Sequence, residues 1–292
     1  MICTHEVNAD KSVTIFAENR SVVTKTVQLL FRELQGYRCS LQENFAFANV
    51  PPGKHEVARL TPENHSSFRS YHYTYRHFDG TIFHKPPDAD FVYLLPASAH
   101  TILRAMRIQS VSSANGENTD DSYFAIGFQY KEGDTICAAR AGTVYACSDT
   151  VREGEKKGEV YKRERNHIRI ESKDGSLCHY DILAPIQLLV TIGDKVIPGQ
   201  PLAVLKGPGQ KYEAYFSVAY LDDAKLKNLP GYPDSKKTVT VYDYIHPQFF
   251  IRETQHGEIP IAGNYYTVEQ PLSVITHEMT KKEKKKLPEK NL

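Results

Sequence analysis

The first hundred residues alternate between apolar and polar side chains with the period of a β-strand. Between Ser66 and Phe78, every second position from Tyr71 to Tyr75 is a tyrosine, and polar residues stand between them. Alternate side chains of a strand point to opposite faces, so this pattern predicts a strand with one apolar and one polar face. The segment Val22–Leu34 is long enough for a helix, but its valines and threonines favour a strand.

Turn signals separate these short stretches. Pro51-Pro52-Gly53-Lys54 follows one alternating stretch and leads into His55–Leu60, which predicts a hairpin. Short strands at this spacing are typical of an antiparallel sandwich. We therefore predict an N-terminal antiparallel β-sandwich over residues 1–105.

The rest of the chain also has mainly β patterning. Strands are predicted within Tyr123–Ala146 and over His167–Glu171, and a turn at Asp174-Gly175 leads to another strand that ends at Ile182. We expect a second β module over residues 106–222 and a C-terminal β extension with a basic tail over residues 223–292.

Two segments are predicted to lie outside the sheets. Residues 149–165 are mostly charged, with both signs mixed, which is typical of a solvated loop or hairpin tip. The lysine-rich segment Thr276–Leu292 is expected to be a frayed tail, and the alternative is contact with an anionic polymer or a membrane surface.

Composition narrows the class of protein. The chain has 292 residues, with 36 Lys and Arg against 35 Asp and Glu, and this balance gives no nucleic-acid footprint over the whole chain. No apolar run approaches the roughly 18 residues of a transmembrane helix. Five cysteines without a CxxC pair indicate neither a disulfide framework nor a zinc ribbon. The first residues lack the basic and apolar regions of a secretory signal, so we expect either a cytoplasmic protein or one whose leader is missing from this chain.

Three glycine-rich segments carry a family resemblance. They are Gly133–Val144, then Asn166–Ile170 with Asp174-Gly175, and then Val190–Val196 with Gly199–Leu202. In this order and spacing, over about residues 120–222, they resemble the lysostaphin/LytM-type zinc peptidases, and Phe91–Pro96 looks like the N-terminal region of one branch. The resemblance implies a duplicated hybrid motif fold, cleavage of peptidoglycan cross-bridges and a place in the bacterial cell envelope.

The family's zinc ligands are not kept at the matching positions. Its active members bind zinc with a His and an Asp of one motif and the second His of an HxH motif, and a further His serves the zinc-bound water. The His of the first motif falls on Tyr123, or on Asp120 at a longer spacing, and its Asp falls on Gly127. The HxH motif falls on Glu213-Ala214-Tyr215. The further His falls on Ile182, or on Ala184 with a two-residue shift. Three N or O ligands would leave zinc an open position for water, but none of these residues is a histidine. The resemblance therefore implies a pseudo-enzyme, without catalytic residues and without bound zinc.

Two other polar residues lie close to the degenerate site. His179 and Asp181 share a strand face, and Glu213 could approach them. A third convergent ligand is not evident, so we expect an ordinary surface instead of a metal site, with His179 facing solvent on a sheet edge and Glu213 as a plain surface carboxylate.

The predicted function is non-catalytic: binding of a cell-wall peptide, or a scaffold for an envelope protein. The main alternative is an active zinc metalloendopeptidase, cutting peptidoglycan cross-bridges with a rearranged ligand set. Biotinyl and lipoyl carrier domains share the GTV…GDKV…GQPL pattern, but nearly fifty residues separate Val144 from Ile192 here, and no Met-Lys-Met-like turn lies between them.

Overall fold

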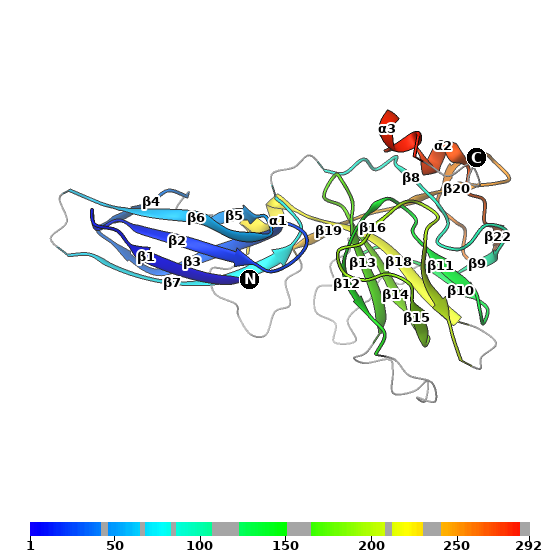
Figure 1. Cartoon of the computed structure of the whole chain (residues 1–292), viewed down its shortest axis with the longest axis horizontal. Coiled ribbons are helices and arrows are strands. Elements are labelled where there is room, and N and C mark those ends of the chain that lie inside the picture. Colours follow the sequence, from blue (N-terminus) through cyan, green and yellow to red (C-terminus); the bar gives the residue numbers. More distant parts are fainter. Residues whose placement is uncertain are drawn as a thin grey trace. The chain divides into compact units, whose positions relative to one another are not determined.

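Antiparallel β-strands make up most of the computed structural model, as the sequence predicts (Figure 1). It describes residues 1–41, 46–64, 68–82, 86–106, 123–150, 165–207, 212–229 and 241–286. The chain forms two compact units. The first contains Met1–Lys85 and Tyr220–Tyr242, and the second contains Pro86–Ala219 and Asp243–Leu292.

The first unit is a β-sandwich of two antiparallel sheets. One sheet has the order β1 (Ile2–Val7), β2 (Val13–Asn19), β6 (Gly53–Pro62) and β4 (Tyr37–Cys39), and the other has β5 (Phe47–Val50), β3 (Lys25–Gln35) and β7 (Ser70–Asp79). Both sheets contribute to one buried core, which includes Ile15, Val27 and Leu60. The unit also contains the short helix α1 (Asp223–Lys227).

Two local expectations for this unit have different outcomes. The Val22–Leu34 region is largely a strand, β3, as its β-branched residues indicate. The predicted hairpin at Pro51–Lys54 is wrong, because β5 pairs with β3 whereas β6 pairs with β2 and β4. The prolines instead carry the chain from one sheet of the sandwich to the other.

The second unit is built on a large antiparallel sheet. Its strands follow the order β16 (Lys195–Val196), β12 (Gly142–Ser148), β13 (Asn166–Glu171), β14 (Leu177–Ile182), β18 (Tyr212–Leu221), β10 (Ile126–Tyr130), β9 (Ile102–Met106) and β22 (Tyr265–Thr267), and β19 (Tyr242–Ile245) also pairs with β18. A smaller sheet contains β11 (Thr135–Cys137), β17 (Pro201–Leu205) and β15 (Ile186–Leu188). A third contains β21 (His256–Glu258), β20 (Gln248–Ile251) and β8 (Val92–Tyr93).

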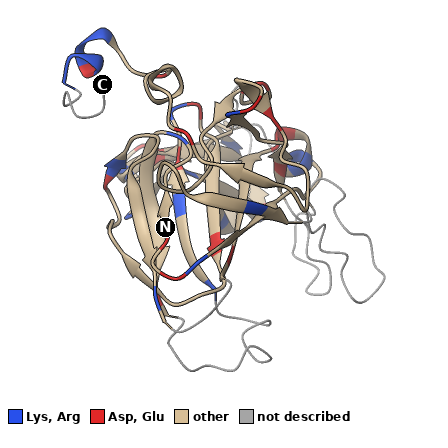
Figure 2. Ribbon diagram, turned by 90° about the vertical axis from the view of Figure 1, so that its right-hand side faces the viewer, with Lys and Arg blue, Asp and Glu red and all other residues tan. Residues whose placement is uncertain are grey.

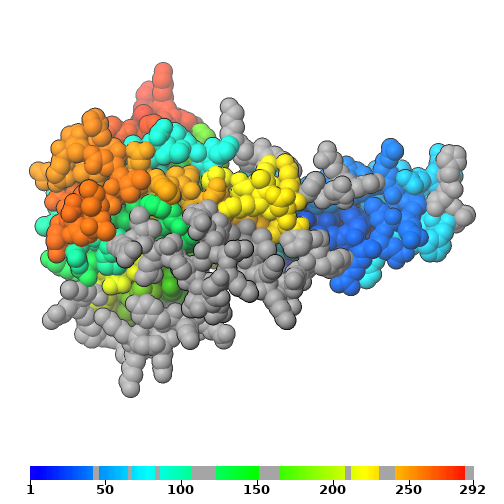
Figure 3. All heavy atoms as spheres, turned by 180° about the vertical axis from the view of Figure 1, so that it is seen from behind, coloured from blue at the N-terminus to red at the C-terminus, as the bar shows by residue number. Residues whose placement is uncertain are grey.

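The boundaries of the two units differ from those of the three segments expected from the sequence. The strands β8 and β9, expected in the N-terminal sandwich, belong to the second unit because β8 pairs with β20 and β9 pairs with β10 and β22. Figure 3 shows the consequence, with cyan and orange segments from distant parts of the sequence lying side by side. Most of the expected C-terminal extension therefore completes the second unit.

The segment after Pro271 is not simply a frayed tail. It contains two short helices, α2 (Leu272–Ile275) and α3 (Lys281–Lys284), and a capping box between Thr280 and Glu283 begins α3. Between the helices, Glu278 forms an ion pair with the buried guanidinium of Arg140. The expectation of fraying fails up to residue 286, and residues 287–292 lie outside the described part. Residues 151–164 of the charged segment also lie outside it.

Candidate functional site

The main sheet of the second unit has one apolar and one polar face. On the apolar face, Ile168, Tyr180 and Phe216 are almost completely buried, and Phe216 packs edge to face against Tyr180 and Phe249. The opposite face, which we call the polar face, consists of alternating positions on β13, β14, β18 and β10, and most of these residues are half-buried. They are His167, Arg169, His179, Asp181, Glu213, Tyr215, Gly127 and Gln129.

Strand register brings most of the positions singled out in the sequence onto this face. Asp181 lies opposite His167 on one side and Tyr215 on the other. Tyr215 in turn lies opposite Gly127 of β10. Of the positions matched to the zinc motifs, Tyr215 is thus the direct neighbour of Asp181, and Gly127 lies one strand further away.

Asp181 is engaged in an ion pair across the hairpin of β13 and β14. Its carboxylate accepts a hydrogen bond from Nη2 of Arg169, and both side chains are about four-fifths buried. Arg169 also donates from Nη1 to the carbonyl oxygen of Tyr180 at 3.1 Å. The negative charge of Asp181 is therefore balanced within the sheet.

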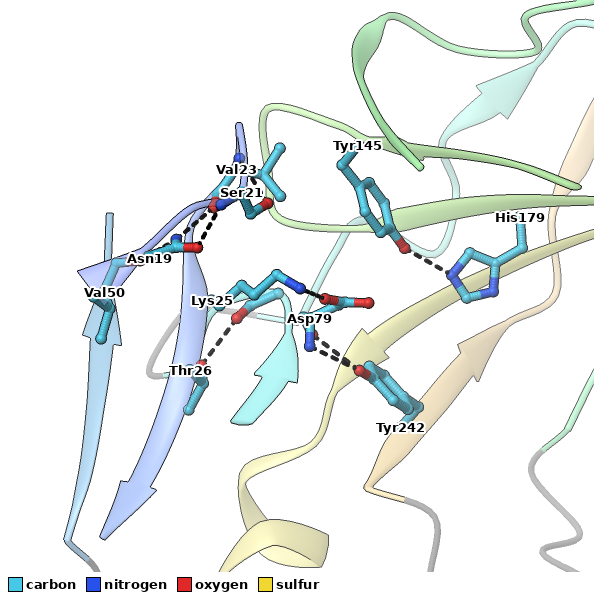
Figure 4. A network of polar contacts seen from close by, with 11 residues as sticks. Asn19, Ser21, Val23, Lys25, Thr26, Val50, Asp79, Tyr145, His179 and Tyr242 are labelled. Atoms are coloured by element: carbon cyan, nitrogen blue, oxygen red, sulfur yellow. Dashed lines mark hydrogen bonds and ion pairs between the residues drawn. The ribbon is translucent and has the colours of Figure 1, made fainter. Parts of the chain in front are cut away.

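His179 is bonded to a tyrosine that the sequence analysis did not single out. Its Nε2 lies 3.2 Å from the hydroxyl of Tyr145 (Figure 4). Burial lowers the pKa of His179 well below its ordinary value, and the positive charges of Arg169 and His167 lower it further. The imidazole is therefore neutral at pH 7. The expectation that His179 lies on a sheet edge is wrong, because β14 lies between β13 and β18.

The ring of Tyr215 occupies the space in front of Gly127. A Cβ atom added at position 127 would lie 3.0 Å from Cε1 of Tyr215 and 3.1 Å from Cε of Met106. The Tyr215 hydroxyl lies 3.5 Å from Oε2 of Glu213, at the limit of a hydrogen bond. Tyr215 therefore packs closely where a carboxylate at position 127 would have to stand.

Tyr123 and Ile182 are placed differently from the others. The ring of Tyr123 packs edge to face against Tyr244, with ring centroids 4.9 Å apart. Burial raises the pKa of Tyr123, and the charge of Asp181 raises it further. Ile182 is fully buried on the apolar face and has no access to the polar one.

The polar face does not fit a catalytic zinc ion. The imidazole of His179 contacts Tyr145, Asp181 contacts the cation of Arg169, and position 127 offers no ligand atom. A zinc ion beside Arg169 would meet a like charge and would have to replace it at Asp181. Among the described residues, no group of three or more His, Cys, Asp or Glu side chains could hold a metal ion.

Tyr145 and Arg169 are the polar-face contacts that sequence reasoning missed. Arg169 could have been found, because the turn at Asp174-Gly175 sets a hairpin register that places it opposite His179. Tyr145 carries no such signal. It lies at an irregularity in the pairing of β12 with β13, where alternation no longer predicts the face of a side chain.

Comparisons with known proteins add little to this geometry. No protein-family model matches the chain, and no curated protein matches it. Among solved structures, the chain is similar to one from Pseudomonas aeruginosa described provisionally as a peptidase M23. The identity is 12%, the match covers 66% of this chain and 82% of that chain, and the TM-score is 0.25. A similarity at this level does not establish a shared activity.

Proposed function

We propose that this chain is a non-catalytic member of the LytM-type peptidase family, with a second unit that binds peptide on its polar face. The glycine-rich segments from Gly133 to Leu202 support the family assignment through their resemblance to LytM-type scaffolds. The observation that carries the non-catalytic role is the packing of Tyr215 against Gly127, at two of the positions matched to zinc ligands.

The chemistry of the polar face suits a peptide. Tyr215 offers an aromatic surface, and Gln129 and Glu213 offer hydrogen-bonding groups on neighbouring strands. A neutral His179 beside Tyr145 adds further hydrogen-bonding capacity without a charge to desolvate. The proposed ligand is the peptide part of bacterial peptidoglycan, which would place the protein in the cell envelope.

The test is binding of soluble peptidoglycan peptides, measured by titration calorimetry. Tyr215→Ala should weaken binding at least tenfold, because it removes the aromatic surface. Tyr265→Ala serves as the matched control, since Tyr265 is an exposed tyrosine on β22, three strands from β18. Equal losses in the two variants, or no binding by the unaltered chain, would contradict the proposal.

A hydrolysis assay separates this proposal from an active enzyme. The chain is incubated with cross-linked peptidoglycan, with and without added zinc, and released peptides are measured by mass spectrometry. No release above the blank is expected. Zinc-dependent release that His179→Ala abolishes would instead identify a peptidase with a rearranged ligand set.

A further inference from the structure

A buried arginine in the second unit joins segments that are far apart in the sequence. The guanidinium of Arg140 is 3% exposed and lies 3.8 Å from the ring centroid of Phe91. It donates to both carboxylate oxygens of Glu278, at 2.9 Å from Nε and 2.6 Å from Nη2. Its Nη1 contacts Oδ2 of Asp174 at 2.9 Å. Glu278 precedes α3, and Asp174 lies in the turn between β13 and β14.

Exposed lysines lie in both segments that Arg140 anchors, and one more lies on a strand paired with β12. Lys173 directly precedes Asp174, and a lysine-rich stretch begins three residues after Glu278. Lys195 lies on β16 and pairs with Thr143 of β12. Thr143 follows Arg140 closely in the chain. The exposed lysines are Lys173, Lys195, Lys281, Lys282, Lys284, Lys285 and Lys286.

The two ion pairs of Arg140 hold the turn that carries Lys173 beside the segment that leads into α3. Hydrogen bonds from Thr280 lower the pKa of the Glu283 carboxyl, and the positive charges of Lys173 and Lys195 lower it further. Figure 2 shows the basic ribbon of α3 standing at one end of the second unit. Arg140 is therefore a positioning residue for one composite basic surface, made of the seven lysines named above.

We propose that this basic surface docks the protein on an anionic lipid bilayer. Residues 281–286 contain no apolar side chain to insert, so attraction to the headgroup plane would supply the affinity. The seven cations are all lysines, which lack the planar fork that arginine uses for paired contacts with phosphates or bases. The stretch also has no aromatic side chain on which a nucleotide base could stack. These features favour a charged plane over a polynucleotide, and they do not depend on what the polar face binds.

The first test is partition of the full chain onto vesicles. We expect binding to vesicles of phosphatidylglycerol and phosphatidylcholine at low ionic strength, and loss of binding in 0.5 M salt or on phosphatidylcholine alone. Each lysine near such a surface contributes about fivefold to partition. Lys281→Gln, Lys282→Gln and Lys285→Gln together should therefore weaken binding roughly 100-fold.

The matched control removes the same charge elsewhere. Lys131→Gln, Lys206→Gln and Lys227→Gln together alter three exposed lysines outside the basic surface, and this variant should retain binding within a few fold. Equal losses in the two triple variants would overturn the proposal, as would no binding to anionic vesicles at low salt. Tighter binding to a polynucleotide than to the vesicles would overturn it as well.

The role of Arg140 in positioning has a separate test. Glu278→Gln removes a negative charge, so a mechanism based on net charge alone predicts tighter binding to the vesicles. Positioning by Arg140 predicts several-fold weaker binding, because the lysines of α3 lose their anchor. Glu278→Asp keeps the charge and shortens the side chain, and it should weaken binding in the same direction. Circular dichroism verifies that each variant is folded, and tighter binding by Glu278→Gln would refute the positioning.

Discussion

Glu278→Gln should destabilise the second unit by about 2–3 kcal/mol. Removing one partner of a buried ion pair costs about 3–5 kcal/mol when the other charge is left without compensation. Arg140 keeps Asp174 at 2.9 Å and Ser176 at 3.1 Å, and the glutamine still offers one acceptor oxygen. The loss is therefore expected to lie below that range, at about 2–3 kcal/mol, which is close to the contribution of one charge-assisted hydrogen bond.

The measurement is differential scanning calorimetry of the full chain. For a unit of this size, each kcal/mol corresponds to a change of about 2–4 °C in Tm, so the transition of the second unit should fall by roughly 5–10 °C. Glu258→Gln, which alters an exposed carboxylate of β21, should change the stability by no more than about 0.5 kcal/mol. An unchanged transition in Glu278→Gln would show that Arg140 does not need this partner.

Three further results are expected. Because the folded chain holds the pKa of His179 below its unfolded value of about 6.5, the unfolded chain takes up the proton first, and the unfolding free energy should fall as the pH drops below about 6.5. Denaturant titrations at pH values from 7 to 5 measure this free energy. It should decrease less in His179→Gln than in the control variant His72→Gln. Chelation with EDTA should leave the Tm unchanged, and a clear drop would reveal a structural metal. Tyr123→His, Gly127→Asp and Tyr215→His together should bind zinc, whereas the unaltered chain and Gly127→Asp alone should not; zinc titration tests all three.

The strands were largely predictable because their signal is local. Alternation at Tyr71–Tyr75 and the turn at Asp174-Gly175 depend only on neighbouring residues, and β7 and the hairpin of β13 and β14 form where they indicate. Pairing between distant strands has no such signal. The contacts of β8 with β20 and of β9 with β22 join segments that the sequence places in different domains, and packing across the whole chain decides them.

The same distinction applies to the two polar clusters. His179 and Asp181 could be assigned to one strand face from their spacing alone. The register of the β13–β14 hairpin then places Arg169 opposite His179, beside Asp181. The ion pair of Arg140 with Glu278 links residues 138 positions apart. Nothing in the local sequence of either residue predicts it, which is why Thr276–Leu292 was expected to fray.

Substitutions at Gly127 and Tyr215 are expected to act together, because the two residues are in contact. A side chain at 127 requires both the Tyr215 ring and the Met106 side chain to shift by a few tenths of an ångström, because its Cβ would lie 3.0 Å and 3.1 Å from their carbon atoms. Tyr215→His places a smaller ring there, which relieves the close contact with a side chain at 127. By itself, however, this substitution supplies only one zinc ligand. Gly127→Asp alone is therefore costly, and Tyr215→His alone adds a single ligand. The two substitutions together relieve the contact with the Tyr215 ring and add two ligands, although the Met106 side chain must still shift slightly. The Tyr215 ring packs against Gly127 because glycine has no side chain there, and this packing does not depend on any ligand that the polar face binds.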